Sequence, residues 1–148
     1  MAIGQEAAHC VETQESRVTS HGITFDTGML VALERRKQPA WEVYKRAHER
    51  QVPITVPTVV IGEWWRGRTD LRETIRMSVR VEPLTDAIAR LAGEALAKVK
   101  RATTIDAFVM ASAALRGDVV YTGDVGDLER LRSFFPGVRV LSIGSATR

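Results

Sequence analysis

Short apolar runs alternate with longer amphipathic stretches along most of this chain. The runs are four or five residues long and rich in valine, isoleucine and threonine, which predicts strands at 23–26, 53–56, 79–83, 118–122 and 138–141. Between them, apolar residues recur at helical spacing, which predicts helices at 28–36, 40–51, 57 or 58 to about 67, 70–77, 85–99, 103–116 and 128–135. The pattern indicates an α/β fold with a mostly parallel five-stranded sheet, covered on both faces by helices, in which the third strand lies near an edge.

The two ends of the chain lack this alternation. Residues 1–21 are polar, have no periodicity and contain no aromatic side chain, which predicts a disordered leader. Residues 144–148 are expected to form a frayed tail. The part between them, residues 22–143, is predicted to be one domain, and a chain of 148 residues is long enough for a hydrophobic core.

Composition excludes several classes of protein. The single Cys10 excludes an internal disulfide and a cysteine-based zinc site, which fits a reducing cytoplasm. No apolar run approaches the ~20 residues of a membrane span, and the first residues do not show the basic-then-apolar pattern of a signal peptide. We therefore expect a cytoplasmic protein with no membrane partner.

The charge is unevenly distributed. The chain carries a net charge of +3, whereas residues 1–21 hold three glutamates against one arginine, so the remainder is the more basic part. Its basic residues form clusters at 35–37, 45–46, 66–68 and 98–101. Such clusters suit a protein that holds a polyanion, although each is equally well explained as a solvated helix face.

Four acidic residues stand at the ends of apolar runs: Asp26, Glu63, Asp106 and Asp124. An isolated carboxylate beside apolar residues is costly to desolvate, so four of them suggest one site that a cation neutralises. Oxygen ligands favour Mg²⁺ or Mn²⁺. In doubly wound sheets, sites form at the carboxyl ends of the strands, where Asp26 and Asp124 would meet if their strands are neighbours.

Each acid also has an ordinary structural explanation. Asp26 and Asp124 can cap the helices that follow them, as can Asp127, and Asp106 stands three residues after Thr103, where it would stabilise the helix dipole. Glu63 is the hardest to explain in this way, because it lies in an apolar stretch where a solvated charge is not expected.

Taken in order, these segments resemble the PIN-domain family, and most closely the VapC toxins of bacterial toxin–antitoxin pairs. The resemblance runs from Ile23 to Leu141 and depends on five segments: Phe25-Asp26-Thr27, Val60-Ile61-Gly62-Glu63, Thr104-Ile105-Asp106-Ala107, Tyr121-Thr122-Gly123-Asp124 and Asp127-Leu128. Any one of them is a weak signal, whereas the ordered set at this spacing is specific.

The resemblance implies a three-layer α/β/α fold and a Mg²⁺- or Mn²⁺-dependent endoribonuclease that hydrolyses RNA phosphodiester bonds. It places Asp26, Glu63, Asp106 and Asp124 on the family's catalytic and metal-binding positions. By the same resemblance, Asp127 is a secondary fifth acid, and Thr122 supplies a hydroxyl that orients Asp124 or a water. It also implies inhibition by a small VapB-type antitoxin, and either a homodimer or a toxin–antitoxin hetero-oligomer.

Around Glu63 the sequence departs from the family pattern, because Gly62 and Trp64 replace a small residue and a leucine. Trp64 and Trp65 point about 100° apart on a helix, so we expect one in the core and the other against a partner or an RNA base. The family antitoxin usually inserts a basic residue near the acids, and arginine suits an acidic pocket.

Other protein classes fit the sequence less well. A haloacid-dehalogenase-like phosphatase needs an aspartate where Gly28 stands, and a receiver domain needs a lysine that 121–124 does not contain. A non-catalytic PIN-fold module that binds RNA or protein remains the alternative, although degraded modules typically lose acids. No dinucleotide or P-loop motif is present, and the three histidines lie outside the matching segments.

Overall fold

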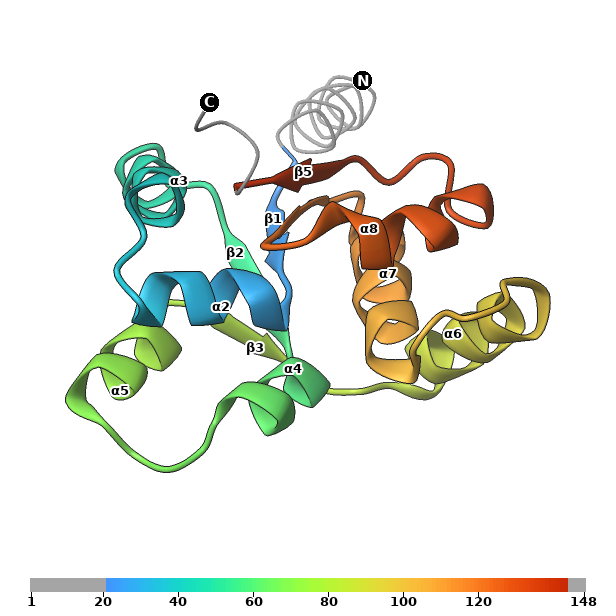
Figure 1. Ribbon diagram of the computed structural model, residues 1–148, viewed down its shortest axis with the longest axis horizontal. Coiled ribbons are helices and arrows are strands. Elements are labelled where there is room, and N and C mark those ends of the chain that lie inside the picture. The colour runs from blue at the N-terminus through green and yellow to red at the C-terminus, as the bar shows by residue number, and fades with distance from the viewer. Residues whose placement is uncertain (1–20, 144–148) are drawn as a thin grey trace, which may run out of the picture.

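The computed structural model describes residues 21–143, so the predictions for residues 1–20 and 144–148 lie outside the described part. Five parallel strands form one sheet in the order β3-β2-β1-β4-β5 (Figure 1). The strands are β1 (Ile23–Phe25), β2 (Ile54–Pro57), β3 (Arg80–Glu82), β4 (Val119–Thr122) and β5 (Val140–Ser142). The five-stranded parallel sheet is confirmed, and β3 is an edge strand as predicted.

Helices cover both faces of the sheet and give the three-layer α/β/α arrangement. They are α2 (Thr27–Glu34), α3 (Gln38–Glu49), α4 (Thr58–Trp64), α5 (Asp70–Met77), α6 (Asp86–Lys98), α7 (Thr104–Arg116) and α8 (Val125–Glu129), and α8 continues into the 3₁₀ helix η1 (Arg130–Ser133). Helices α2 and α3 pack on one face, whereas α7 packs on the other with α6 outside it (Figure 1). No helix within residues 21–143 has both the length and the hydrophobicity of a membrane span.

Capping residues set the ends of several helices. Thr85 and Thr103 cap α6 and α7, because their hydroxyls accept the otherwise unpaired N–H groups of Ile88 and Asp106. At the other end of α7, Gly117 adopts a left-handed conformation with φ 76°, which glycine tolerates best.

Two predicted helices are placed differently in the structure. The helix expected at 128–135 is replaced by α8 and η1, because the Asp124 carboxylate caps the chain earlier by accepting the Gly126 N–H at 2.9 Å. The helix expected to reach about residue 67 ends at Trp64, since the backbone at Trp65 turns to an extended conformation.

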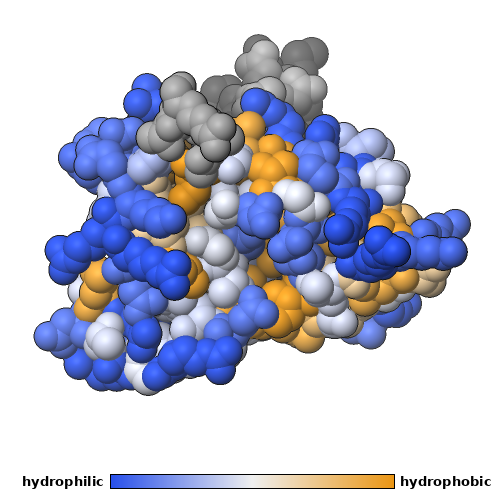
Figure 2. Space-filling model, viewed as in Figure 1, coloured by the Kyte–Doolittle hydropathy of each residue, from blue (hydrophilic) through white to orange (hydrophobic). Residues whose placement is uncertain are grey.

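The core lies between the sheet and the two helical layers. Helix α7 is buried from Ala107 to Ala113, apart from the half-buried Phe108, and its alanines and Ser112 let it approach the strands closely. On the opposite face, Leu30 and Leu33 of α2 are fully buried. Hydrophilic side chains dominate the periphery of the face in Figure 2, with apolar residues toward its middle.

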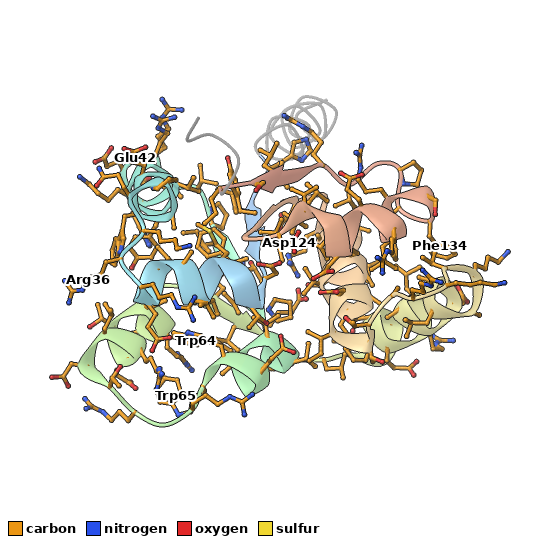
Figure 3. The ribbon with its side chains drawn as sticks, viewed as in Figure 1. Arg36, Glu42, Trp64, Trp65, Asp124 and Phe134 are labelled. Atoms are coloured by element: carbon orange, nitrogen blue, oxygen red, sulfur yellow. The ribbon has the colours of Figure 1, made fainter. Side chains whose placement is uncertain are left out.

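The two adjacent tryptophans divide as predicted. Trp64 is only 3% exposed, and its indole N–H donates to Glu34 at 3.2 Å. Trp65 is half-buried, and its ring meets that of Trp64 edge-on at 6.0 Å between centroids (Figure 3). Trp64 is therefore the core residue, and Trp65 is the one that can meet a partner.

One polar network ties α7 to the sheet and was not predicted. Arg116 donates to Asp118 (2.9 Å), Thr24 (2.6 Å) and Glu82, and Ser112 donates to Glu82 at 2.5 Å. Thr24 also donates to Asp118 at 2.8 Å, and both of these residues are buried. Because every charge here has a partner, the ion pairs and hydrogen bonds offset part of the desolvation penalty of burying the network.

Candidate active site

The site is built around Asp26, which follows the last residue of β1 and caps α2. Its Oδ1 atom accepts the Met29 N–H at 2.9 Å, and its Oδ2 atom accepts the Thr122 hydroxyl. Asp26 is only 8% exposed. Asp26 can therefore cap α2 and still line the candidate site, because the cap leaves its carboxylate facing the carboxyl edge of the sheet.

Strands β1 and β4 are direct neighbours, as the site hypothesis required. Phe25 pairs with Tyr121, which places Asp26 beside Thr122. The Thr122 hydroxyl also accepts the Asp124 N–H at 3.0 Å. Thr122 thus connects the backbone at Asp124 to the carboxylate of Asp26, a contact that the sequence did not predict.

The segments after β1 and β4 approach each other at two glycines. A Cβ on Gly28 would lie 3.1 Å from the backbone nitrogen of Gly123, and a Cβ on Gly123 would lie 3.1 Å from the carbonyl oxygen of Gly28. Both neighbours are backbone atoms, which cannot move aside as a side chain can. The bare glycines therefore allow Asp26 and Asp124 to face the same cavity.

Gly123→Ala is expected to lower the free energy of unfolding by about 1–3 kcal/mol, because the added methyl group overpacks this contact. Urea denaturation measures the change. Gly93→Ala in α6 is the matched control: its Cβ would meet nothing within 4 Å, so a gain of about 0.5–1 kcal/mol is expected. A similar gain at Gly123 would contradict the tight approach.

The remaining acids come from α4, α7 and α8. Asp106 lies in the first turn of α7 and is half-buried. Glu63, Asp124 and Asp127 are exposed. The apolar surroundings predicted for Glu63 are therefore absent: Val60 and Trp64 occupy the buried face of α4, and Glu63 lies on its open face.

The structure brings all five predicted acids to one cavity of about 300 Å³. Its lining residues are Asp26, Thr27, Gly28, Val31, Glu63, Ile105, Asp106, Val109, Thr122, Asp124 and Asp127. We call this the acid cavity. In Figure 3, Asp124 lies between α2 and α7.

Thr27 is a residue of the acid cavity that sequence analysis did not single out. Its hydroxyl oxygen is enclosed and has no hydrogen-bond partner within the described residues. A buried hydroxyl without a partner is costly, so this oxygen leaves a hydrogen bond unmet at the wall of the acid cavity. The signal in the sequence was a hydroxyl residue directly after Asp26, at the first position of the helix.

Burial and mutual repulsion in the acid cavity oppose ionisation of its carboxyl groups. Burial raises the pKa of Asp26 from its ordinary 3.8 to about 6; the hydrogen bonds from Thr122 and Met29 lower it, and the charges of Asp106 and Glu63 raise it further. Burial also raises the pKa of Asp106, with added repulsion from Asp127, Glu63 and Asp124 and a partly opposing hydrogen bond with Thr103. A bound cation would relieve this repulsion.

A family model described as the PIN domain matches residues 23–133 of the sequence. The chain belongs to the PIN domain family. A comparison with curated proteins gives no significant match.

Solved structures with the same fold include components of toxin–antitoxin complexes. A chain of the DNA-bound VapBC complex from Salmonella typhimurium aligns with a TM-score of 0.66 at 17% identity, over 83% of this PIN protein and 98% of that chain. A chain of a toxin–antitoxin complex from Klebsiella pneumoniae aligns with a TM-score of 0.62 at 21% identity, over 82% of this protein and 98% of that chain. A chain of VapBC2 from Rickettsia felis, bound to a promoter DNA fragment, aligns with a TM-score of 0.65 at 10% identity, over 81% of this protein and 97% of that chain. At these identities the likeness shows the fold.

The donor set of this PIN domain suits a hard divalent cation. It is made of carboxylate and hydroxyl oxygens, which Mg²⁺ and Mn²⁺ prefer. Within residues 21–143, no three carboxylate, imidazole or thiol groups are already arranged as the ligands of one ion. Glu63 and Asp127 are solvent-exposed, so they can rotate toward an ion at little cost.

Proposed function

We propose that this PIN domain is a metal-dependent endoribonuclease of the toxin–antitoxin type, held inactive by a small VapB-type antitoxin. The observation that carries the proposal is the acid cavity, in which residues from four separate segments meet at the carboxyl edge of the sheet. Two of the acids, Asp26 and Asp106, have raised pKa values, which is typical of functional sites.

We assign Asp26, Asp106 and Asp124 as the main metal ligands, with Glu63 in the same set and Asp127 secondary. When bound, Mg²⁺ or Mn²⁺ would supply an activated water and positive charge opposite the scissile phosphate. Thr122 holds Asp26 through its hydroxyl and thereby limits rotation of that carboxylate. The enclosed Thr27 hydroxyl can donate to a phosphate oxygen or to a water in the acid cavity.

Two observations support the proposal of an antitoxin: the negative charge of the acid cavity, and the solved structures of similar fold. An arginine entering the acid cavity would find carboxylates able to accept charge-assisted hydrogen bonds. The similar folds occur in complexes named as toxin–antitoxin pairs, some of them bound to DNA. We therefore propose that a cognate antitoxin covers the acid cavity and blocks access by RNA.

The decisive experiment is incubation of total RNA with the purified full chain, with Mn²⁺ or with EDTA. Discrete fragments that form only with metal would support the endoribonuclease, and the proposed chemistry predicts fragments with 5′-phosphate and 3′-hydroxyl ends. Metal binding without cleavage of any RNA would favour the alternative, a PIN-fold module that binds RNA or protein without cutting.

Metal binding is also expected to stabilise the fold, because the ion binds the assembled acids and not the unfolded chain. At a concentration ten times its Kd, Mg²⁺ would add about 1.4 kcal/mol and raise the Tm by roughly 5 °C. Asp26→Asn should remove most of this shift, whereas Asp86→Asn on the exposed surface of α6 should retain it. An identical melting curve with and without millimolar Mg²⁺ or Mn²⁺ would contradict the metal site.

A further inference from the structure

Two further cavities continue from the acid cavity along α2 and α3. The middle cavity, of about 470 Å³, shares Gly28, Val31 and Asp124 with the acid cavity. The α3 cavity, of about 420 Å³, shares Pro39 and Ile143 with the middle cavity. Because neighbouring cavities have lining residues in common, the three lie side by side in a row that starts at the carboxylates.

The charge reverses along this row of cavities. Arg35 and Lys37 line the middle cavity, and Arg46 and Arg50 line the α3 cavity. Among residues 21–143, none of these four cations has a carboxylate within ion-pairing distance. Glu42, the acid of the α3 cavity, accepts instead from Gln38 at 3.3 Å. Positive charge that has no acidic partner among residues 21–143 suits an external anion.

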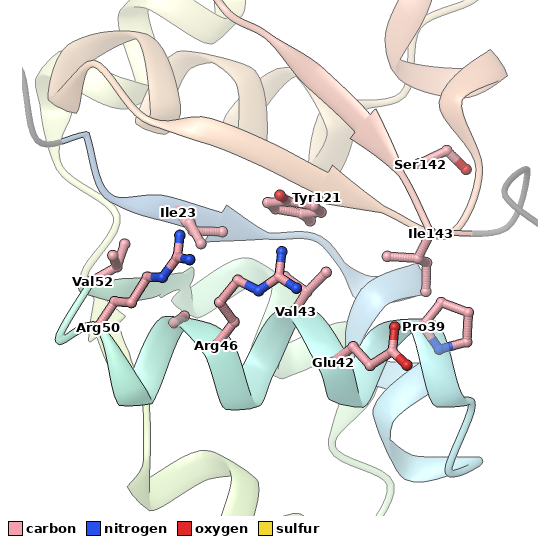
Figure 4. Close-up of a pocket in the computed structure, with 11 residues that line it drawn as sticks. Ile23, Pro39, Glu42, Val43, Arg46, Arg50, Val52, Tyr121, Ser142 and Ile143 are labelled. Atoms are coloured by element: carbon pink, nitrogen blue, oxygen red, sulfur yellow. The ribbon is translucent and has the colours of Figure 1, made fainter.

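The two arginines of α3 are arranged to act together. They stand four residues apart, so they lie on one face of the helix and about 6 Å apart along its axis. Figure 4 shows both guanidinium groups projecting from α3 toward the sheet, on the side of Ile23 and Tyr121. Two cations spaced along one wall suit successive charges on a chain better than a single small anion.

The opposite wall of the α3 cavity contributes an aromatic ring. Tyr121 is half-buried and lines the α3 cavity from β4, next in sequence to the site residue Thr122. Single-stranded nucleic acids bind in grooves that combine cations with aromatic rings, on which bases stack. A duplex keeps its bases stacked on one another and would not bring one to this ring.

We propose that the acid, middle and α3 cavities form one groove that binds single-stranded RNA beside the scissile phosphodiester. In this groove Arg46 and Arg50 contact phosphates, Arg35 and Lys37 neutralise the stretch nearer the acids, and Tyr121 stacks on a base. The inference rests on the proposed nuclease function and extends it to the substrate: an unpaired segment of several nucleotides on one side of the cut.

Binding is tested with wild-type full chain in EDTA, so that no cleavage occurs, and a fluorescein-labelled oligouridylate of about 15 nucleotides. Arg46→Gln/Arg50→Gln should weaken binding about tenfold and reduce the slope of log K against log salt by about 1.4, the contribution of two phosphate contacts to a single strand. Tyr121→Leu should weaken binding without changing that slope, because stacking releases no counterions.

Arg90→Gln/Lys98→Gln is the matched control. Both residues are exposed cations on one helix, α6, which lies outside α7 on the other side of the sheet (Figure 1). This pair removes the same charge, so wild-type-like affinity is expected. A loss equal to that of the α3 pair would mean that overall charge, and not the groove, sets the affinity, and it would overturn the proposal.

Two other results would also overturn the groove. The first is a wild-type affinity and salt slope for Arg46→Gln/Arg50→Gln, which would indicate that a protein partner, and not RNA, occupies the cavities. The other is equally tight binding of a duplex of the same length. Cleavage of the oligonucleotide with Mn²⁺ is measured separately. If binding depends on the groove residues but no cleavage occurs, the nuclease proposal is wrong and the groove stands. If cleavage occurs but binding does not depend on the groove residues, the groove proposal is wrong and the nuclease stands.

Discussion

Asp26→Asn is expected to lower RNA cleavage by at least about 10²- to 10³-fold, the usual loss when one preorganised electrostatic group is removed from a site. The amide keeps the shape of the carboxylate: its oxygen can accept the Met29 N–H, and its NH₂ group can donate to the Thr122 hydroxyl, which donates to the carboxylate in the wild type. The loss is therefore expected in catalysis and not in folding. The measurement is kcat/KM on a labelled RNA with Mn²⁺, with Asp86→Asn as the exposed control.

The same substitution should stabilise the metal-free protein. Burial raises the pKa of Asp26 from 3.8 to about 6, so the folded state retains a proton that the unfolded state has lost between these pH values. Ionised Asp26 therefore costs up to about 3 kcal/mol above pH 6 and nothing below about pH 4. Asparagine does not titrate, so the variant should be more stable than wild type at pH 7 and similar at pH 4.

Urea denaturation without metal at the two pH values tests this. Normal cleavage by Asp26→Asn would refute the assigned acid site. Equal stability of the two proteins at pH 7 would show that desolvation of Asp26 is not the dominant cost in the cavity.

Arg116→Met is expected to lower the free energy of unfolding by about 3–5 kcal/mol, the usual cost of breaking a buried ion pair from one side. The side chain of Arg116 is 20% exposed and that of its partner Asp118 is 4% exposed. Without the guanidinium, Asp118 and Glu82 remain in the network with no cation. Chemical denaturation measures the loss, and circular dichroism checks the fold.

Two further variants make this test specific. Arg90→Met breaks an exposed pair with Asp86, so a change within about 1 kcal/mol is expected. Arg116→Lys retains the charge but not the planar fork, so an intermediate loss is expected even if Arg116→Met does not fold. A loss for Arg116→Met no larger than that for Arg90→Met would show that the network contributes little to stability.

The sequence predicted the strands well because each is a short β-rich run between turns, and a parallel sheet buries such runs on both faces. Helix ends were less predictable. The apolar pattern continues through Trp65, yet α4 ends at Trp64, where tertiary packing buries the ring and the backbone then turns. The start of α8 was set by the Asp124 cap, which serves the site and the helix together.

The site itself was predictable as a set of acids but not as a set of environments. Order along the chain and the adjacency of β1 and β4 placed the acids together. Exposure depends on how each side chain is placed: the rotation of α4 leaves Glu63 on its open face, whereas the junction between β1 and α2 encloses Asp26. The Arg116 network was not visible in the sequence, because its members are far apart in the chain and each resembles an ordinary surface residue.

The position of β1 in the middle of the sheet bears on how this protein is made. Asp26 leaves the ribosome before its hydrogen-bond partner Thr122, which lies 96 residues further along the chain and belongs to β4. A nascent chain that ends before β4 lacks Thr122, Asp124 and Asp127, and with them one side of the acid cavity. The acid cavity therefore cannot form in the growing polypeptide until β4 has been synthesised, and the proposed nuclease can become competent only after that strand has left the ribosome.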